Sequence, residues 1–167
     1  MHRLLGLALC IAQSGCSLIL DFSDNQIPID APQDIFTVAE CSFDEPNDSF
    51  AAATPRTSGE TVSAALCADG FQDVDFYKIT VPAATNTLTV ALTFNTLEGD
   101  LDLHLYDSTG AEKSFAAGNL DNEQIVCPGV TPACDIGMPI AEGDYAVEVR
   151  SVANVQNTYS LAITLGM

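Results

Sequence analysis

The cysteines are the residues of this 167-residue chain whose type and spacing first suggest a chemistry. After position 40 their number is even, which is typical of disulfides in an oxidising compartment. Four such cysteines allow three pairings. Because Cys127 and Cys134 flank a loop that contains Pro128 and Pro132, we predict that these two pair and that Cys41 pairs with Cys67. The six cysteines are Cys10, Cys16, Cys41, Cys67, Cys127 and Cys134.

Histidine chemistry is restricted to one residue, because His104 is the only histidine after His2. A serine triad needs a histidine base, and the chain contains neither a Gly-x-Ser-x-Gly nor a His-Glu-x-x-His motif. Structural zinc sites use Cys-x-x-Cys or histidine pairs, and both are absent from the sequence. The sequence therefore predicts disulfides rather than zinc, and it does not predict an enzyme.

Four polar residues alternate with three leucines between positions 100 and 106. Side chains two residues apart in a strand point to the same face, about 7 Å apart. Leu101, Leu103 and Leu105 would then face a core, and the polar set would face water, a covering loop or a ligand. The surface patch predicted in this way consists of Asp100, Asp102, His104 and Tyr106.

The chain is strongly acidic, with 5 basic and 23 acidic residues and a net charge of −18. Arg3 precedes every acid, so a product trimmed near residue 16 would carry 4 − 23 = −19. Phosphate contacts need Lys and Arg, which argues against nucleic-acid binding. At 47% hydrophobic residues the chain is too apolar to be a disordered acidic tail, and its length suits one domain.

The N-terminus is typical of an export signal: a basic start is followed by an apolar run from residue 4 to residue 12. Ser14-Gly15 before Cys16 resembles a bacterial lipobox, although Gln13 replaces the usual aliphatic residue. We therefore predict a signal over residues 1–16, lipidation of Cys16, and contact with a membrane only through that lipid anchor. The alternatives are an ordinary cleaved signal and an uncleaved anchor, which at 17 residues (4–20) is short of the roughly 20 that span a bilayer.

The rest of the chain divides into a tether and a β domain. Residues 17–34 have two prolines, four aspartates and no lasting period, which indicates a flexible tether. From residue 35 to 167, apolar residues alternate with polar ones in short runs separated by Gly-containing turns, and no helical period persists. The pattern predicts a single all-β domain, an antiparallel and jelly-roll-like β-sandwich. The predicted strands are 61–66, 75–81, 87–94, 100–106, 144–150 and 158–165.

Four motifs, in this order along the chain, resemble the bacterial pre-peptidase C-terminal (PPC) domain family. They are Glu-Pro-Asn-Asp-Ser at 45–49, Asp-Val-Asp-Phe-Tyr-Lys-Ile at 73–79, Gly-Asp-Leu-Asp-Leu-His-Leu-Tyr-Asp at 99–107, and Gly-Asp-Tyr-Ala-Val-Glu-Val at 143–149 with Tyr-Ser-Leu at 159–161. The resemblance extends over roughly residues 40–165. It implies a small β-sandwich module that accompanies secreted peptidases.

The resemblance also implies a calcium site, because some members of the family bind calcium at the start of the domain. The residues that match its ligand stretches are Glu45, Asn47, Asp48, Asp73 and Asp75. Calcium prefers six to eight oxygen ligands, which carboxylates and amides supply. Phe43 stands where calcium-binding members often have another acid. The alternative is a turn at 46–48 and solvated acids at a strand end.

Taken together, these features predict a non-catalytic binding or accessory module of the bacterial cell envelope. We expect it to be lipid-anchored, at the outer membrane, or secreted. Its partner would be an extracellular polymer, a protein or a neighbouring exported enzyme. The alternative is a structural or chaperone-like lipoprotein subunit of an envelope complex. Calcium is the one cofactor that these residues suggest.

Overall fold

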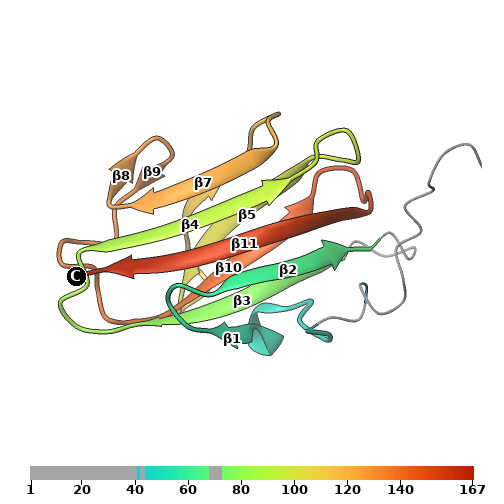
Figure 1. Cartoon of the computed structure of the whole chain (residues 1–167). Helices are drawn as coiled ribbons and strands as arrows, with labels where there is room; N and C mark the ends of the chain where they lie inside the picture. Colours follow the sequence, from blue (N-terminus) through green and yellow to red (C-terminus); the bar gives the residue numbers. More distant parts are fainter. Residues whose placement is uncertain (1–40, 42–43, 68–72) are drawn as a thin grey trace, which may run out of the picture. The chain divides into compact units, whose positions relative to one another are not determined.

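The computed structural model describes residues 41, 44–67 and 73–167 (Figure 1). The predicted signal (1–16), the lipidation of Cys16 and the tether (17–34) lie outside these residues. Within them, no helix is long and apolar enough to cross a membrane.

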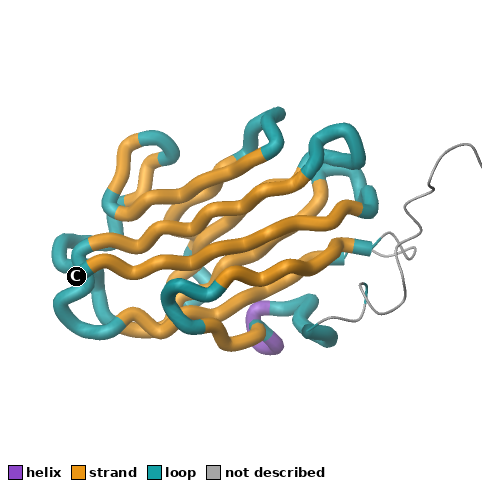
Figure 2. The backbone as a smooth tube through the Cα atoms, in the orientation of Figure 1, coloured by secondary structure: helices purple, strands orange, loops and turns teal. Residues whose placement is uncertain are grey.

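Nearly all of the regular structure in residues 41, 44–67 and 73–167 is β, and helix there is limited to one short 3-10 turn (Figure 2). The elements in chain order are η1 (Phe50–Ala52), β1 (Thr54–Arg56), β2 (Thr61–Leu66), β3 (Val74–Val81), β4 (Thr87–Phe94), β5 (Leu101–Asp107), β6 (Glu112–Ala116), β7 (Asn122–Cys127), β8 (Gly129–Val130), β9 (Ala133–Cys134), β10 (Gly143–Ser151) and β11 (Asn157–Gly166).

The strands form two main sheets. Sheet A has five strands in the order β1-β3-β10-β5-β6, and sheet B has four in the order β2-β11-β4-β7. Pairing is antiparallel except between β1 and β3, and a two-stranded β8-β9 ribbon stands apart from both sheets. All six strands predicted from alternation are present, and the prediction of an all-β sandwich is confirmed.

One hydrophobic core lies between the two sheets, because the alternation places one face of each strand inward. Leu101, Leu103 and Leu105 of β5 are fully buried, as are Leu88 and Val90 of β4. Burial of such side chains contributes on the order of 1.5–3 kcal/mol each. The core fixes the register of β3, β5 and β10, and this register in turn places the acidic residues at the strand ends.

Both predicted disulfides are present. Cys41 is bonded to Cys67, directly after β2, and Cys127 of β7 is bonded to Cys134 of β9. The first bond joins cysteines that are 26 positions apart in the sequence, and the second joins cysteines only 7 apart. The long-range bond therefore joins the segment before η1 to sheet B, whereas the short one fastens a local ribbon.

Candidate metal centre

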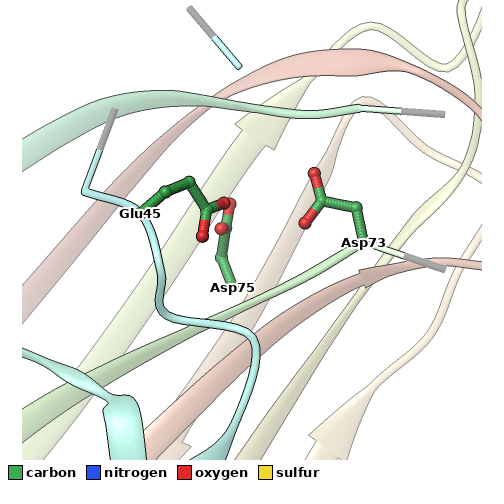
Figure 3. A group of neighbouring side chains, drawn as sticks. All are labelled: Glu45, Asp73 and Asp75. Atoms are coloured by element: carbon green, nitrogen blue, oxygen red, sulfur yellow. The ribbon is translucent and has the colours of Figure 1, made fainter. Parts of the chain in front are cut away.

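Three carboxylates from two chain segments meet at the start of β3 (Figure 3). Glu45 comes from the segment before η1, Asp73 precedes β3, and Asp75 lies in β3. One oxygen of each lies within 4.8 Å of the others. Asp75 is 1% exposed, while Glu45 and Asp73 are partly buried. The structure thus brings together residues that are 28 and 30 positions apart in the sequence.

Backbone contacts hold the two segments in place. The Phe76 amide donates to the Asn47 carbonyl over 3.0 Å, which fixes the first segment against β3. Within that segment the Asn47 amide N–H donates to a Glu45 carboxylate oxygen at 2.9 Å. These contacts turn Glu45 towards Asp75.

The Asn47 side chain is fully buried at this centre, with 0% exposure. Its amide lies near enough to Asp75 to lower the pKa of that carboxyl. Neither its oxygen nor its nitrogen makes a hydrogen bond of good geometry with any residue that the structure describes. Because buried polar groups normally have a partner, an amide in this state fits a site that a ligand completes.

Asp48 lies at the edge of the same cluster. Its side chain is exposed, and its carboxylate is near enough to raise the pKa of Asp73. All five residues predicted as calcium ligands are therefore neighbours in the fold.

Burial without compensating cations makes this cluster costly to ionise. Burial is the main cause that raises the pKa of Asp73 to about 6 and that of Asp75 to about 7. The neighbouring carboxylate of Glu45 raises both pKa values further. Neither Asp73 nor Asp75 forms an ion pair with a described Lys, Arg or His.

A hydroxyl chain supports Asp75 from the core side. The Tyr159 hydroxyl donates to the Asp75 carboxylate, and the Tyr77 and Tyr159 oxygens are 2.6 Å apart. Both tyrosines are buried. The alternation predicted Tyr159 only as an inward strand residue, because sequence periodicity carries no information about which residue a hydroxyl meets across the core.

The donor set fits a hard cation. Three carboxylates with a nearby fourth offer oxygen donors, the Asn47 side-chain amide lies beside them, and no histidine or free cysteine of the described residues belongs to the cluster. Calcium takes six to eight oxygens in flexible geometry, and bidentate carboxylates with solvent could complete its shell. A bound dication would also favour the ionised forms of Asp73 and Asp75.

The other predicted set, Asp100 to Tyr106, does not form one exposed surface. Asp100 precedes β5, and the other three residues lie on the outer face of that strand. His104 is only 4% exposed and its Nδ1 lies 2.8 Å from a Glu112 oxygen of β6. The Tyr106 hydroxyl donates to Glu148 at 2.6 Å. These contacts cross-link β5 to β6 and β10, and they give the set a role in holding the strands together.

The comparisons with known proteins agree with this fold. The family model described as the bacterial pre-peptidase C-terminal domain matches residues 73–164, which is more than half of the chain. The chain therefore belongs to this family, a class of non-catalytic β-sandwich modules. No curated protein matches the sequence.

The chain also matches solved structures at low identity. The pre-peptidase C-terminal domain of a Bacillus anthracis collagenase matches with a TM-score of 0.51 and 17% identity over 67% of this chain and 94% of that domain. A periplasmic inhibitor of g-type lysozyme from Aeromonas hydrophila, PliG, matches with a TM-score of 0.43 and 15% identity over 68% and 98%. The CspB protease of Clostridium perfringens matches with a TM-score of 0.45 and 10% identity over 72% of this chain and 30% of the protease.

Proposed function

We propose that the protein is a non-catalytic accessory module of the bacterial envelope or of the secreted fraction, and that calcium stabilises its fold. The observation that carries the calcium proposal is the cluster of Glu45, Asp73 and Asp75 beside the buried Asn47 amide, which makes no hydrogen bond of good geometry with a described residue. Ionising such a cluster without a cation is unfavourable because the carboxylates repel one another. A bound dication would attract each of them and make the ionised forms favourable.

The binding role rests on the family and on charge. Members of the family are modules that accompany other exported proteins, and a net charge of −18 favours a basic partner through electrostatic steering. The partner would be an extracellular polymer, a protein or a neighbouring exported enzyme. Lipidation of Cys16 would hold the module at a bacterial membrane, and the outer membrane is the location we propose. Two disulfides in the described residues are consistent with an oxidising compartment.

Thermal melting of the full chain tests the calcium proposal. Extracellular calcium modules bind with dissociation constants of about 10⁻⁴ to 10⁻³ M. About 10 mM CaCl₂ should then stabilise the folded state by roughly 1.4 to 2.7 kcal/mol relative to EDTA, because the ion binds the folded form only. Magnesium at the same concentration should have a smaller effect, since it demands a tighter octahedral shell.

Variants locate the effect. Glu45→Gln, and the double variant Asn47→Ala with Asp48→Ala, should abolish most of the calcium shift. Glu60→Gln is the matched control, because Glu60 is exposed and lies away from the cluster. Its carboxylate accepts a hydrogen bond from the Thr57 amide at 2.8 Å. An unchanged melting temperature in calcium, or equal shifts in Glu45→Gln and Glu60→Gln, contradicts the proposal.

The accessory role needs a separate measurement. The full chain, immobilised on beads, should retain a component of envelope or culture-fluid extracts in calcium and release it in EDTA. The Glu45→Gln protein should retain less of that component. Retention of nothing above the level of an acidic control protein argues against a binding role.

A further inference from the structure

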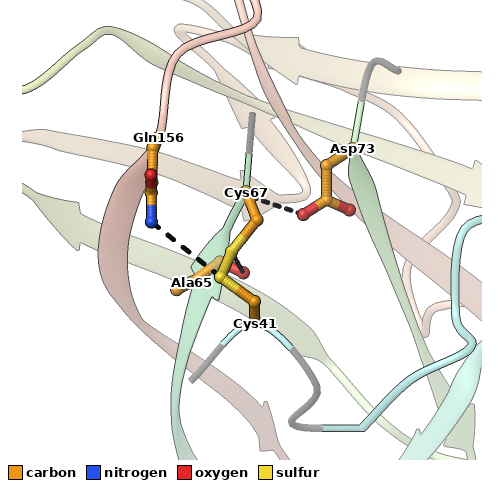
Figure 4. Close-up of a disulfide and its surroundings, with 5 residues drawn as sticks. All are labelled: Cys41, Ala65, Cys67, Asp73 and Gln156. Carbon is orange, nitrogen blue, oxygen red and sulfur yellow. Dashed lines mark hydrogen bonds between the residues drawn. A yellow bond between two sulfur atoms is a disulfide. The ribbon is translucent and has the colours of Figure 1, made fainter. Parts of the chain in front are cut away.

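The Cys41–Cys67 disulfide lies beside the carboxylate cluster, and Figure 4 shows its link to Asp73. Cys67 is bonded through sulfur to Cys41, which lies only four residues before Glu45. The backbone N–H of the same Cys67 donates to an Asp73 oxygen at 2.5 Å. One residue thus links the Glu45 segment to the Asp73 side of the site.

Non-covalent contacts also join the first segment to the rest of the domain, among them a bond from the Thr54 hydroxyl to the Asp44 carbonyl at 3.4 Å. An ion pair joins Asp44 to Arg56, and the Asn47 carbonyl accepts from the Phe76 amide. Within the part of the chain that the structure describes, the Cys41–Cys67 disulfide is the one covalent cross-link between this segment and the sheets. Opening it would free the Cys41 end of the segment to sample many conformations, and a cation would then have to order that segment again.

We infer that the Cys41–Cys67 disulfide makes cation binding depend on oxidation. With the disulfide formed, Glu45 and Asn47 are held against Asp73 and Asp75, and the site is pre-organised for the ion. With the two thiols reduced, affinity falls because binding must first restore that arrangement. The inference rests on the proposed calcium site and adds its regulation: the module becomes a good cation binder only after it reaches an oxidising compartment.

The redox step balances with a dithiol such as dithiothreitol as the reductant. The dithiol transfers two electrons and two protons to the Cys41–Cys67 bond, which gives two thiols, and it is itself oxidised to a cyclic disulfide. Cys41 is partly exposed, whereas Cys127 and Cys134 are 0% and 2% exposed. A reductant should therefore reach the bond beside the cluster more readily.

The second disulfide provides the control within the same chain. It closes only the short connection between β7 and β9, and the described contacts of Cys127 and Cys134 include none with the carboxylate cluster. Its loss should cost stability without changing how Glu45 is placed.

Calcium titration of two double variants is the first test. Cys41→Ser with Cys67→Ser should bind calcium at least about fivefold more weakly than wild type, within the usual range of coupling between sites. Cys127→Ser with Cys134→Ser should bind within about twofold of wild type, with Cys10 and Cys16 unchanged in every protein. Affinity is measured by calorimetry at a temperature where both variants are folded. Equal affinity in the two variants overturns the inference.

Reduction of the wild-type protein tests the same coupling without any variant, in case the first one does not fold. If reduction of Cys41–Cys67 weakens calcium binding by some factor, calcium must lower the equilibrium constant for that reduction by the same factor. At fixed ratios of reduced to oxidised dithiothreitol, alkylation and peptide mass analysis should show this disulfide retained in calcium and lost in EDTA. The Cys127–Cys134 bond should respond less, and an equal response of the two bonds overturns the inference.

These outcomes are distinct from failure of the proposed function. If wild-type oxidised protein shows no calcium-dependent rise in melting temperature, the calcium site itself is wrong. If wild type responds and the Cys41→Ser, Cys67→Ser protein responds equally, the site stands and its dependence on the disulfide is wrong.

Discussion

Asp75 and Asp107 occupy strands on either side of β10 and lie towards opposite ends of it. Asp75 of β3 is the register partner of Val149, and Asp107, the last residue of β5, is the partner of Tyr145. Burial raises the pKa of Asp75 to about 7, with nearby carboxylates adding to the effect. Hydrogen bonds from Lys113 and Thr109 hold the pKa of Asp107 well below its usual range.

The two aspartates differ in the donors that face them. Asp107 accepts from the Thr109 amide and hydroxyl at 2.8 and 2.6 Å and from the Ala111 amide at 3.1 Å, and Lys113 lies 2.7 Å away. Asp75 faces one tyrosine hydroxyl, the Asn47 side-chain amide and two other carboxylates. The local turn therefore satisfies Asp107, whereas Asp75 has fewer donors and more neighbouring negative charge. Under the calcium proposal, this difference separates an acid with a purely structural role from one that binds the cation.

The largest effect should come from removing the hydroxyl that supports Asp75. Tyr159→Phe deprives the buried carboxylate of a donor and leaves the Tyr77 hydroxyl without its partner. Buried polar groups that lose a partner cost about 1–3 kcal/mol, and more when the partner is charged. We expect a loss of about 2–3 kcal/mol in the free energy of unfolding, measured by urea denaturation near pH 8.

Tyr145→Phe is the matched change at the other end of β10. The Tyr145 hydroxyl donates to the nearby Ala141 carbonyl at 3.1 Å, an ordinary neutral bond. Its loss should cost only about 0.5–1.5 kcal/mol. If the two variants lose similar free energies of unfolding, the bond from Tyr159 to Asp75 contributes no more than an ordinary neutral hydrogen bond.

The pH dependence of stability should have opposite signs at the two ends. Asp73 and Asp75 have folded pKa values of about 6 and about 7, above the unfolded value near 3.9. The folded state therefore binds more protons between about pH 4 and pH 7, so stability from this end is present at the acid side and is lost as pH rises. Asp107, with its lowered pKa, contributes stability above about pH 4 that is lost below it.

In EDTA we expect the ionisation of Asp75 alone to lower the free energy of unfolding by about 2 kcal/mol between pH 5 and pH 7, and that of the half-buried Asp73 to lower it further. Calcium should reduce this fall, because it binds the ionised carboxylates and stabilises them most at higher pH. Urea midpoints across the range measure both curves. A curve in EDTA that rises from pH 5 to pH 7 is incompatible with the buried acids of the Asp75 end.

The strands that sequence periodicity identified are those with an apolar inward face. β6 and β7 were missed because their patterns are inverted or interrupted. In β6 the inward residues are Ser114 and Ala116 while Phe115 is 53% exposed, and in β7 the inward set includes Glu123. Polar residues at inward positions near a sheet edge hide the period of two. These two edge strands were thus harder to predict than the strands at the centre of each sheet.

The site was predictable only in part for a related physical reason. Family motifs indicated Glu45, Asn47, Asp48, Asp73 and Asp75, and the structure groups the carboxylates of Glu45, Asp73 and Asp75. The contacts of Cys67 and Tyr159 with the cluster depend on the packing of sheet A against sheet B, which no local pattern records. For His104, alternation gave the correct face but not its burial, since the cover comes from neighbouring strands.

Neutralising each aspartate should have the smallest effect on stability. It also tests the difference between Asp75 and Asp107 most directly. In EDTA at pH 8, Asp75→Asn removes a buried negative charge from beside Glu45 and Asp73, so its melting temperature should rise by about 3 °C. Its calcium shift should disappear, because a ligand carboxylate is lost. Differential scanning calorimetry with and without calcium measures both quantities.

Asp107→Asn removes the same charge where donors already satisfy it. An amide accepts less strongly from Lys113 and Thr109, so the melting temperature should fall by about 1–2 °C while the calcium shift stays intact. Opposite signs from one chemical change would show that the acid at the start of β3 is destabilising until a cation arrives. If Asp75→Asn instead lowers the melting temperature in EDTA as much as Asp107→Asn does, both aspartates are ordinary structural acids and the cluster has no need of an ion.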